Sequence, residues 1–411
     1  MSEILFLAHR IPFPPDRGDK IRSHHVLKAL ARLAPVHVAT FADEPEDMAQ
    51  EAELATLAAS HCLVERRKPL AIAGLEALAR REPVSLAAFR DRALASYVAK
   101  VLTERPISAI YVFSGQMAQY VPKTFTGHVV ADLVDVDSAK FEAYGASGKG
   151  PRAWIERREG RMLSRVEQAV VERSDTTLLI SDEECELLRS RLLSGVSARD
   201  VHAMGNGIDA ALFDPALVAA NPAMAAMPGP RVIFTGQMDY APNIAAAERA
   251  IRAIMPRVRE IFPDASFHVV GRNPPESLRA FDGSGGVKVW GRVPDIRPFL
   301  AGADLALVPL EIARGVQNKV LEAMAMGLPV VLSPGAATGI AARDGRDFAI
   351  AESDADLVQA LISLARDREA ARAMAVSARG WILANASWPA ALARLPEFCG
   401  LAQGREHIDA A

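Results

Sequence analysis

The sequence predicts an α/β protein built from two doubly wound domains, and three observations carry this prediction. Short apolar runs alternate with longer helical patterns along both halves of the chain, which is typical of parallel sheets covered by helices on both faces. This alternation is interrupted once, at residues 214–230 (DPALVAANPAMAAMPGP), where four prolines and no strand pattern predict a linker. The chain has 411 residues, too many for one compact core and suited to two domains.

The first domain is predicted over residues 1–213. It opens with a short apolar run of the buried-strand type and then alternates strands with helical patterns. Its strands are expected at residues 4–8, 36–41, 62–65, 109–113, 128–133 and 176–180, and its helices at residues 20–33, 46–59, 71–80, 86–104, 152–173 and 183–191. Ligands of such sheets bind beyond the carboxyl ends of the strands, so the loops that follow the strands are the expected place for chemistry.

The second domain is predicted over residues 231–385, where the same alternation resumes. Its strands are expected at residues 231–235, 266–271, 287–290, 304–310, 329–333 and 348–351, and its helices at residues 243–254, 317–326, 354–366 and 369–384. Two domains of this kind joined by a short linker are expected to form a cleft that holds the ligand.

The bulk composition excludes several classes of protein. A formal net charge of −3 gives no global field for binding nucleic acid. Cys62, Cys185 and Cys399 are far apart, form no metal-binding spacing and suit a reducing cytoplasm. The start, MSEILFLAHR, is a first strand rather than a signal segment, and no run approaches the roughly 20 apolar residues of a membrane span. We therefore expect a soluble protein, attached at most to a membrane surface.

The stretch ARGVQNKVLEAMAMGLPVV, residues 313–331, predicts an anion site at the start of a helix. A helix N-terminus has unpaired N–H groups and a partial positive charge. Gly315 allows close backbone approach, while Arg314 and Lys319 supply cations for a diphosphate. Glu322, one turn further, could accept hydrogen bonds from the two hydroxyls of a ribose. The alternative is that Glu322 only complements the helix dipole and that the cations are solvated.

The end of this stretch resembles the signature of family 4 glycosyltransferases, which are retaining enzymes of the GT-B fold that use sugar nucleotides. The family segment reads E-A-M-A-x-G-x-P-V-V, and its first Glu binds the ribose of the nucleotide, a role that the resemblance assigns to Glu322. Relatives carry a second Glu eight residues earlier, against the donor sugar. Arg314 stands there in this chain, which suggests altered contacts to the phosphate or the sugar.

Other segments extend the resemblance along the chain. Residues 206–209 (NGID), followed by Phe213, resemble the end of the N-terminal domain of the family, and residues 291–295 (GRVPD) resemble its loop beside the nucleotide base. Gly236-Gln237 stands where relatives carry cations for the phosphates. The resemblance implies donor contacts from Gly236, Gln237, Asn243, Arg272, Arg292, Val293, Gly315, Asn318 and Glu322. It also implies that residues 386–411 cross back onto the N-terminal domain.

Two loops of the N-terminal domain are expected to face the acceptor. Gly18, Asp19 and Lys20 stand between the first strand and the first helix, where relatives carry a Gly-Gly pair. The alternative for Asp19 is a helix cap.

Asp135 and Asp137 follow the strand at 128–133. A D-x-D motif binds metal in the other glycosyltransferase fold, GT-A, but that fold lacks the C-terminal signature, so we favour a contact to the acceptor. The alternative is again capping. No metal and no cofactor are expected.

Two basic, amphipathic segments offer membrane contacts. Trp154, Arg158, Arg161 and Arg165 share one face of the helix at 152–173, and ERRKPLAIAGLEALARRE at residues 65–82 is a second patch. Such faces could rest on anionic lipid headgroups or grip an acceptor pyrophosphate. The neighbouring Glu156 and Glu159 favour an ordinary salt-bridged, solvated face.

More narrowly, four segments resemble the sugar transferases of the bacterial exosortase/PEP-CTERM exopolysaccharide system. These are RIPFPPDRGDKIRSHH, LVDVDS, GQMDYAPN and RGVQNKVLEAMAMG. The resemblance implies transfer of a hexose from a nucleoside diphosphate to a lipid-linked or saccharide acceptor hydroxyl, with retention of configuration. The acceptor would lie at the inner face of the cytoplasmic membrane. Lys319 and Arg314 would stabilise the leaving diphosphate, and Asp135 would face the acceptor. The alternatives are a sugar-nucleotide epimerase of the same fold and a non-catalytic nucleotide-sugar-binding protein.

Overall fold

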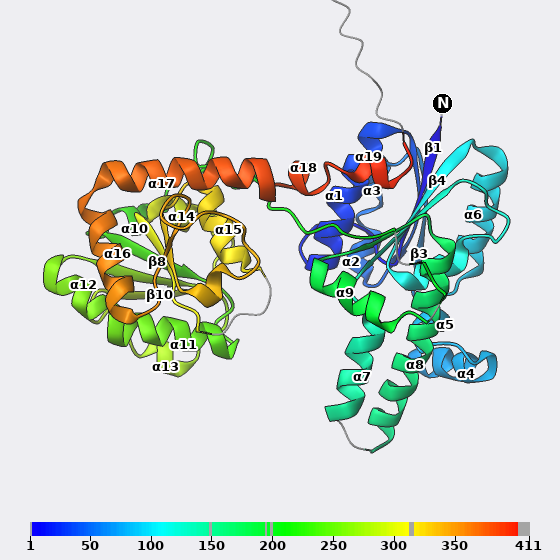
Figure 1. The fold of residues 1–411 in the computed structure, drawn as a ribbon, viewed down its shortest axis with the longest axis horizontal. Coiled ribbons are helices and arrows are strands. Elements are labelled where there is room, and N and C mark those ends of the chain that lie inside the picture. The colour runs from blue at the N-terminus through cyan, green and yellow to red at the C-terminus, as the bar shows by residue number, and fades with distance from the viewer. Residues whose placement is uncertain (1, 148–149, 194, 198–199, 312–315, 402–411) are drawn as a thin grey trace, which may run out of the picture. The chain divides into compact units, whose positions relative to one another are not determined.

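The computed structural model describes residues 2–147, 150–193, 195–197, 200–311 and 316–401. The chain forms two compact units (Figure 1). Unit 1 comprises Met1–Asn206 together with the chain from Ala391 onward, and unit 2 comprises Gly207–Ala390. Of the described helices, none combines the length and the apolar character that crossing a membrane requires.

Unit 1 is built on a seven-stranded parallel sheet. Its strands are β1 (Glu3–Ala8), β2 (Val36–Ala42), β3 (Ser60–Glu65), β4 (Ile107–Phe113), β5 (His128–Val134), β6 (Thr176–Leu179) and β7 (Val201–Ala203). The strand order is β3-β2-β1-β4-β5-β6-β7, and every pair is parallel. All residues of β1 and β2 are buried, because helices cover both faces of the sheet. The order reverses between β1 and β4, where doubly wound sheets open a crevice for ligands.

The helices of unit 1 surround this sheet. They are α1 (Gly18–Leu33), α2 (Pro45–Met48), α3 (Glu51–Leu57), α4 (Leu70–Arg80), α5 (Val84–Ala88), α6 (Arg92–Glu104), the 3-10 helix η1 (Gly115–Tyr120), α7 (Asp137–Ser147), α8 (Gly150–Arg173), α9 (Asp182–Arg191) and α19 (Leu395–Phe398). Helices α7 and α8 pack along one another, and the short α19 packs against α1. Helix α19 also accepts a hydrogen bond at the carbonyl of Phe398 from His128, so the end of the described chain belongs to unit 1.

A buried ion pair ties α1 to the sheet of unit 1. The guanidinium of Arg22 donates from Nε and Nη2 to the two carboxylate oxygens of Asp132, at 2.9 and 3.0 Å. Tyr111 donates to the same carboxylate at 2.7 Å, and Arg22 Nη1 reaches the carbonyl of Met204 at 2.7 Å and Asn206 Oδ1 at 3.1 Å. Both charges are buried and hydrogen-bonded, so this network fixes the last residues before unit 2 begins.

Unit 2 repeats the architecture of unit 1 on a smaller scale. Its strands are β8 (Arg231–Thr235), β9 (Ser266–Val270), β10 (Val287–Gly291), β11 (Leu305–Val308), β12 (Val330–Leu332) and β13 (Ala349–Ile350). They form a parallel sheet in the order β10-β9-β8-β11-β12-β13, so the order again reverses at the first strand. One large apolar core surrounds this sheet.

The helices of unit 2 are α10 (Pro222–Ala225), α11 (Ala241–Arg249), the π-helix η2 (Ala250–Ile254), α12 (Met255–Ile261), α13 (Glu276–Arg279), α14 (Arg297–Gly302), α15 (Asn318–Ala325), the 3-10 helix η3 (Pro334–Ala337), α16 (Asp354–Arg366), α17 (Arg368–Trp381), the π-helix η4 (Ile382–Ala386) and α18 (Trp388–Ala391). Helix α15 buries Val320, Leu321, Ala323, Met324 and Ala325, so its polar side is the one that carries Lys319 and Glu322.

The predicted linker at residues 214–230 lies within unit 2 rather than outside both units. Its short helix α10 is capped by the side chain of Asn221, and the backbone N–H of Asn221 donates to the carbonyl of Pro298. Met224 is completely buried against Gly302 of α14. The proline-rich segment is therefore packed, and the units meet in the chain at residues 206/207 and 390/391.

Two further predictions of single elements differ from the structure, and two elements were not predicted. The helix expected at 86–104 is split, because Asp91 caps a new helix α6 with its side chain. The helix expected at 46–59 is likewise divided into α2 and α3. Helix α7 and strand β7 carry no clear apolar periodicity and were not predicted from the sequence.

Candidate functional site

Three neighbouring strands of unit 2 end in glycines that lie against one another. The N–H of Gly236, after β8, donates to Val270 of β9 at 3.1 Å, and the N–H of Gly271 donates to Gly291 of β10 at 2.9 Å. A Cβ atom placed on Gly271 would lie 1.6 Å from the carbonyl oxygen of Gly236. No side chain fits there, so bare backbone forms the carboxyl edge of the sheet at this point.

Lys319 of α15 lies beside this glycine edge. Its ammonium Nζ donates to Asn243 Oδ1 and to Gln317 Oε1, each at 3.1 Å. Asn243 in turn donates from Nδ2 to the carbonyl of Gln237 at 2.9 Å. A Cβ atom on Gly236 would stand 3.2 Å from Lys319 Cε. The structure thus brings together four residues that the sequence analysis assigned to the donor site: Gly236, Gln237, Asn243 and Lys319.

The charge of Lys319 is only partly compensated. Its hydrogen-bond partners within the described residues are neutral amide oxygens, and the ring of Phe234 lies 5.9 Å from Nζ. Burial lowers the pKa of Lys319, an effect that the nearby charge of Glu322 opposes. Burial raises the pKa of Glu322, and the charge of Lys319 opposes that shift. A half-buried cation held by neutral oxygens at a helix start is suited to accept an anion.

The remaining predicted donor residues occupy the same edge of unit 2. Arg272 and Arg292 follow β9 and β10 and are exposed, while Val293 is half-buried against the core. Asn318 is the first residue of α15, and the preceding Gln317 makes no side-chain cap, so its amide is directed to Lys319 instead. Arg314 and Gly315 lie outside the described residues.

Unit 1 carries a polar cavity of about 360 Å³ at the point where its strand order reverses. Most of the residues that line it stand at the carboxyl ends of β1, β4 and β5 or at the start of α1, and Phe89 follows α5. The lining residues are His9, Arg10, Arg17, Asp19, Phe89, Phe113, Ser114, Gln116, Leu133, Val134, Asp135 and Asp137. Three of the predicted acceptor-side residues, Asp19, Asp135 and Asp137, are therefore gathered in one cavity.

Asp19 is held in this cavity by cations rather than used as a helix cap. Its carboxylate accepts from Arg10 Nη1 at 2.6 Å and from Arg17 Nε at 2.9 Å, and His9 Nε2 lies 3.4 Å away. The helix itself has Arg17 at its N-cap without a side-chain cap bond. Burial alone would raise the pKa of Asp19, but the hydrogen bonds from His9, Arg17 and Arg10 hold it well below its usual range. Asp19 is a carboxylate at every ordinary pH.

Asp135 and Asp137 share one cation. Lys140 Nζ lies 2.6 Å from Asp135 Oδ2 and 3.5 Å from Asp137 Oδ1. Burial raises the pKa of Asp137, the charge of Lys140 opposes the shift and the charge of Asp135 adds to it. The D-x-D motif therefore forms an ion-paired cluster on the cavity wall.

The loop at residues 18–20 matches the prediction only in part. Lys20 does not line the cavity, because its ammonium is buried against the carboxylate of Asp47 and the carbonyl of Phe13. Gly18 is exposed, and a Cβ atom placed on it would meet nothing within 4 Å. The glycine at this position is thus not required by packing within unit 1.

His9 and Arg10 line the polar cavity but were not singled out from the sequence. His9 is buried, its ring stacks on Phe113 with centroids 5.8 Å apart, and its Nδ1 atom has no hydrogen-bond partner among the described residues. Arg10 bridges Asp19 and Asp43. The available signal was their position, since both come directly after the first buried strand.

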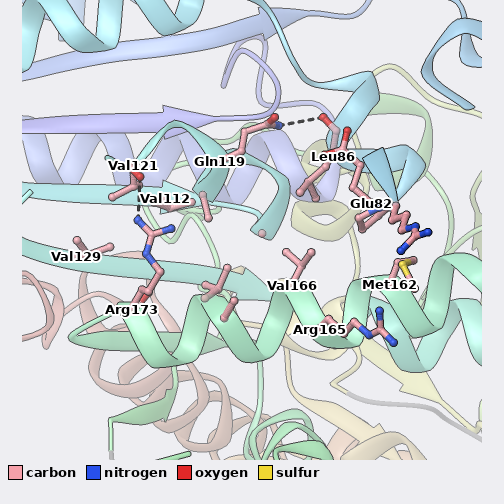
Figure 2. A pocket seen from close by; sticks show the side chains of 17 residues that line it. Glu82, Leu86, Val112, Gln119, Val121, Val129, Met162, Arg165, Val166 and Arg173 are labelled. Atoms are coloured by element: carbon pink, nitrogen blue, oxygen red, sulfur yellow. Dashed lines mark hydrogen bonds between the residues drawn. The ribbon is translucent and has the colours of Figure 1, made fainter. Parts of the chain in front are cut away.

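A second cavity of unit 1, of about 280 Å³, is mostly apolar (Figure 2). It lies between η1 and α8, and Arg165 of the predicted basic stripe lines it. The stripe is not uniform: Arg158 donates to the carbonyls of Ala77 and Glu82 and is structural, whereas Trp154 is 52% exposed. Such an apolar cavity is unsuited to a diphosphate, so the polar edges of the two sheets remain the candidate functional sites.

Comparison with known proteins bears on both units. Residues 229–367, which include the glycine edge, Lys319 and Glu322, match the sequence model of a family described as group 1 glycosyl transferases. No curated protein matches the chain.

Several solved structures resemble the whole chain. They include HepE from Anabaena in complex with UDP-glucose (15% identity, covering 97% of this chain and 99% of that chain, TM-score 0.56). Sucrose-phosphate synthase from Thermosynechococcus elongatus is similar as well (16%, 97% and 98%, TM-score 0.57). So is WaaG, a glycosyltransferase involved in lipopolysaccharide biosynthesis (18%, 97% and 100%, TM-score 0.54). At these identities the likeness establishes the fold: the chain has the two-domain GT-B fold that the sequence predicts.

Proposed function

We propose that this protein is a glycosyltransferase that takes a hexose from a nucleoside-diphosphate sugar bound to unit 2. The observation that carries the proposal is Lys319, a half-buried ammonium held by neutral oxygens beside the bare glycine edge. The match of residues 229–367 to group 1 glycosyl transferases supports it, and HepE, a protein of the same fold, was crystallised with UDP and with UDP-glucose.

In the proposed reaction, the bond between the anomeric carbon of the sugar and the diphosphate breaks, and the acceptor oxygen bonds to that carbon. The departing diphosphate gains negative charge in the transition state. Lys319, the start of α15 and the predicted contacts of Arg314 and Gly315 would stabilise that charge without reorganising. Glu322 would accept the ribose hydroxyls. The departing phosphate would take the proton of the acceptor hydroxyl on the same face, which gives retention of configuration. We propose that no metal ion is needed.

The acceptor is proposed to bind at the polar cavity of unit 1. Asp135 and Asp137 stand on its wall with Lys140 and can accept hydrogen bonds from sugar hydroxyls. The resemblance to exosortase-associated transferases suggests a lipid-linked or saccharide acceptor in exopolysaccharide synthesis. The protein would act in the cytoplasm, with peripheral contact to the inner face of the cytoplasmic membrane.

The test is a panel of UDP-, GDP-, ADP- and TDP-sugars, scored first by thermal shift and then by product formation on bacterial lipid and oligosaccharide extracts. We expect one nucleotide to stabilise the protein, and its sugar to appear on an acceptor with the anomeric configuration of the donor by NMR. An isomerised sugar nucleotide formed without acceptor would identify an epimerase instead. Stabilisation without turnover on any extract would identify a non-catalytic binding protein. No stabilisation by any nucleotide would refute the donor site itself.

A further inference from the structure

We propose that the apolar groove between η1 and α8 binds the hydrocarbon chain of an anionic lipid. If the proposed function holds, that lipid is the carrier of the acceptor, and this step of the inference rests on that function. The walls and rim of the groove define a binding site that does not depend on the proposed function. Its occupancy by a lipid chain is testable without any transferase assay.

The walls of the groove are hydrocarbon on both sides. Val112, Ala118 and Val129 contribute from the sheet and η1, and Met162, Val166 and Val170 contribute from α8 (Figure 2). A volume of about 280 Å³ is close to the lower bound of roughly 300 Å³ for small-molecule sites. Each methylene of a chain that enters would be stabilised by leaving water. Apart from Gln119, whose buried Oε1 has no hydrogen-bond partner among the described residues, these walls suit an alkyl segment.

The rim of the groove is basic. Arg173 lies toward one end, where Nη2 donates to the carbonyl of Val121 at 2.9 Å, and Arg165 lies toward the other end (Figure 2). Arg81 also lines the cavity, and within the described residues neither Arg81 nor Arg165 makes an ion pair. The one carboxylate at the rim, Glu82, is already paired with Arg90. A phosphate head on the chain would therefore meet uncompensated positive charge.

The groove is preformed by buried polar contacts from α8. Glu159 is 3% exposed and accepts from the N–H groups of Val84 and Ser85, which fixes the start of α5 against α8. One residue earlier in the chain, Arg158 donates to the carbonyls of Ala77 and Glu82 and fixes the end of α4. The turn between α4 and α5, which closes one end of the groove, is thus held by α8 and does not need a ligand to form.

The helix that precedes this turn is apolar on its exposed side. Leu70, Ile72, Leu75 and Leu78 of α4 are 68%, 51%, 68% and 52% exposed, while only Ala73 and Ala77 of the helix are buried. Arg66, Arg67 and Lys68 precede the helix, and Arg80 and Arg81 close it. Arg66, Arg67 and Lys68 are each paired with a carboxylate, so the basic charge beside these exposed aliphatic side chains comes from Arg80 and Arg81. Exposed aliphatic residues beside cations are suited to the headgroup region of an anionic bilayer. A lipid could therefore pass its chain into the groove while its bilayer neighbours cover α4.

The groove also shares a wall with the polar cavity. Gly115 of η1 lines the apolar groove, while the adjacent Ser114 and Gln116 line the polar cavity with Asp135 and Asp137. The two sites therefore lie on two sides of one short helix. An amphipathic acceptor fits this pair, with its chain on one side of η1 and its sugar or phosphate head on the other.

The test is whether monododecyl phosphate binds the full chain saturably below its critical micelle concentration. Binding is measured by intrinsic fluorescence and by calorimetry. Val166→Trp fills the groove, and Gln168→Trp adds the same side chain on the opposite side of α8. Arg165→Glu reverses a rim charge without touching the core, and Arg161→Glu makes the same change at an exposed position that does not line the groove. We expect roughly tenfold weaker binding for Val166→Trp and about fivefold weaker binding for Arg165→Glu, because apolar area and one charge contact are lost.

The controls are expected to stay within about twofold of the wild type. Inorganic phosphate and dodecanol, each carrying one half of the ligand, are expected to bind more weakly than monododecyl phosphate. Stabilisation by a nucleotide sugar is expected to be unchanged in Val166→Trp, so a failure of this proposal is separable from a failure of the donor site.

Four results would overturn the proposal. One is the absence of saturable binding, and another is an equal loss in the paired control variants. The third is binding to vesicles of phosphatidylglycerol but not to the monomeric lipid, which would assign the contact to the α4 surface alone. A lipid-free dimer by light scattering that Val166→Trp dissociates would show that a second copy of the chain fills the groove, and would also overturn it.

Discussion

The two units differ in how the charged side chains at the carboxyl edge of the sheet are paired. Both sheets reverse their strand order at the first strand of the unit, and both gather polar residues at that carboxyl edge. In unit 1 the charges are matched: Asp19 is paired with Arg10 and Arg17, and Asp135 and Asp137 with Lys140. In unit 2, Lys319 is held by neutral oxygens and stands beside bare backbone. A matched edge suits neutral hydroxyls, and a partly compensated cation suits a phosphate. Under the proposed function, unit 1 would therefore be the acceptor side and unit 2 the donor side.

Removing the unmatched cation is expected to have the largest effect. In the proposed reaction, Lys319→Ala deletes the charge that stabilises the leaving diphosphate, and the loss of one such group costs about 100- to 1000-fold in rate. The measurement is single-turnover transfer with the sugar nucleotide that gives the thermal shift. Lys288→Ala is the matched control, since Lys288 is also in unit 2 but pairs with Asp282 at 3.1 Å. An equal loss of rate in the two variants would contradict a special role for the charge of Lys319 at the edge of the unit 2 sheet.

Glu322→Gln is expected to have the second-largest effect. A charged acceptor of hydroxyl hydrogen bonds is worth about 1.5–3 kcal/mol, so the nucleoside diphosphate should bind roughly 10- to 100-fold more weakly. The specific readout is sugar recognition: the preference for the ribonucleotide over its 2′-deoxy analogue, measured by calorimetry, should shrink in the variant. Glu276→Gln, an exposed change on α13 of the same unit, should leave that preference intact. A preference that persists in Glu322→Gln would remove this residue from the ribose contact.

Much of the glycine edge and the neighbouring Lys319 could be predicted from the sequence, because these residues stand at the ends of predicted elements. Gly236, Gly271 and Gly291 each end an apolar run, and Lys319 and Glu322 open the helix of a recognisable segment. What the sequence does not contain is the pairing of these residues. Lys319 meets Asn243 across 76 positions of the chain, and a one-dimensional pattern does not encode which amide turns toward which ammonium.

The loop after the first strand shows more clearly what the sequence alone could not predict. Asp19, Lys20 and Arg22 lie within one turn of α1, yet only Asp19 lines the cavity. Lys20 is buried in an ion pair with Asp47, and Arg22 in an ion pair with Asp132. The position of each cation therefore depends on a carboxylate far along the chain. Composition misleads in a similar way at residues 214–230, where the prolines predict a linker but buried Met224 anchors the segment.

A smaller effect is expected on thermal stability, where a glycine-to-alanine change should destabilise unit 2 but not unit 1. Gly271→Ala puts a Cβ atom 1.6 Å from the carbonyl oxygen of Gly236, so the β8 and β9 loops must move apart. Overpacking of this kind costs about 1–3 kcal/mol, which corresponds to a fall in Tm of roughly 2–12 °C for a unit of this size. Gly18→Ala meets nothing within 4 Å and should not lower Tm. Calorimetric scans of both variants measure the difference, and a neutral Gly271→Ala would contradict the close approach of the two loops.

The smallest expected effect is a pH dependence of nucleotide affinity, which should arise from Lys319 beside the glycine edge. Burial lowers the pKa of Lys319, so its ammonium loses the proton at a lower pH than an exposed lysine would, and the affinity for a nucleoside diphosphate should fall as pH rises. The ligand itself keeps its charge in this range, because the second ionisation of a phosphate lies near pH 6. We expect the affinity to decline between pH 7.5 and 9, measured by calorimetry in buffers of constant ionic strength. Lys319→Arg replaces the ammonium with a guanidinium that stays charged throughout, so it should bind more weakly but with a flat profile. A decline that persists in Lys319→Arg would show that another group titrates, and the unmatched charge of unit 2 would then not be the one that holds the diphosphate.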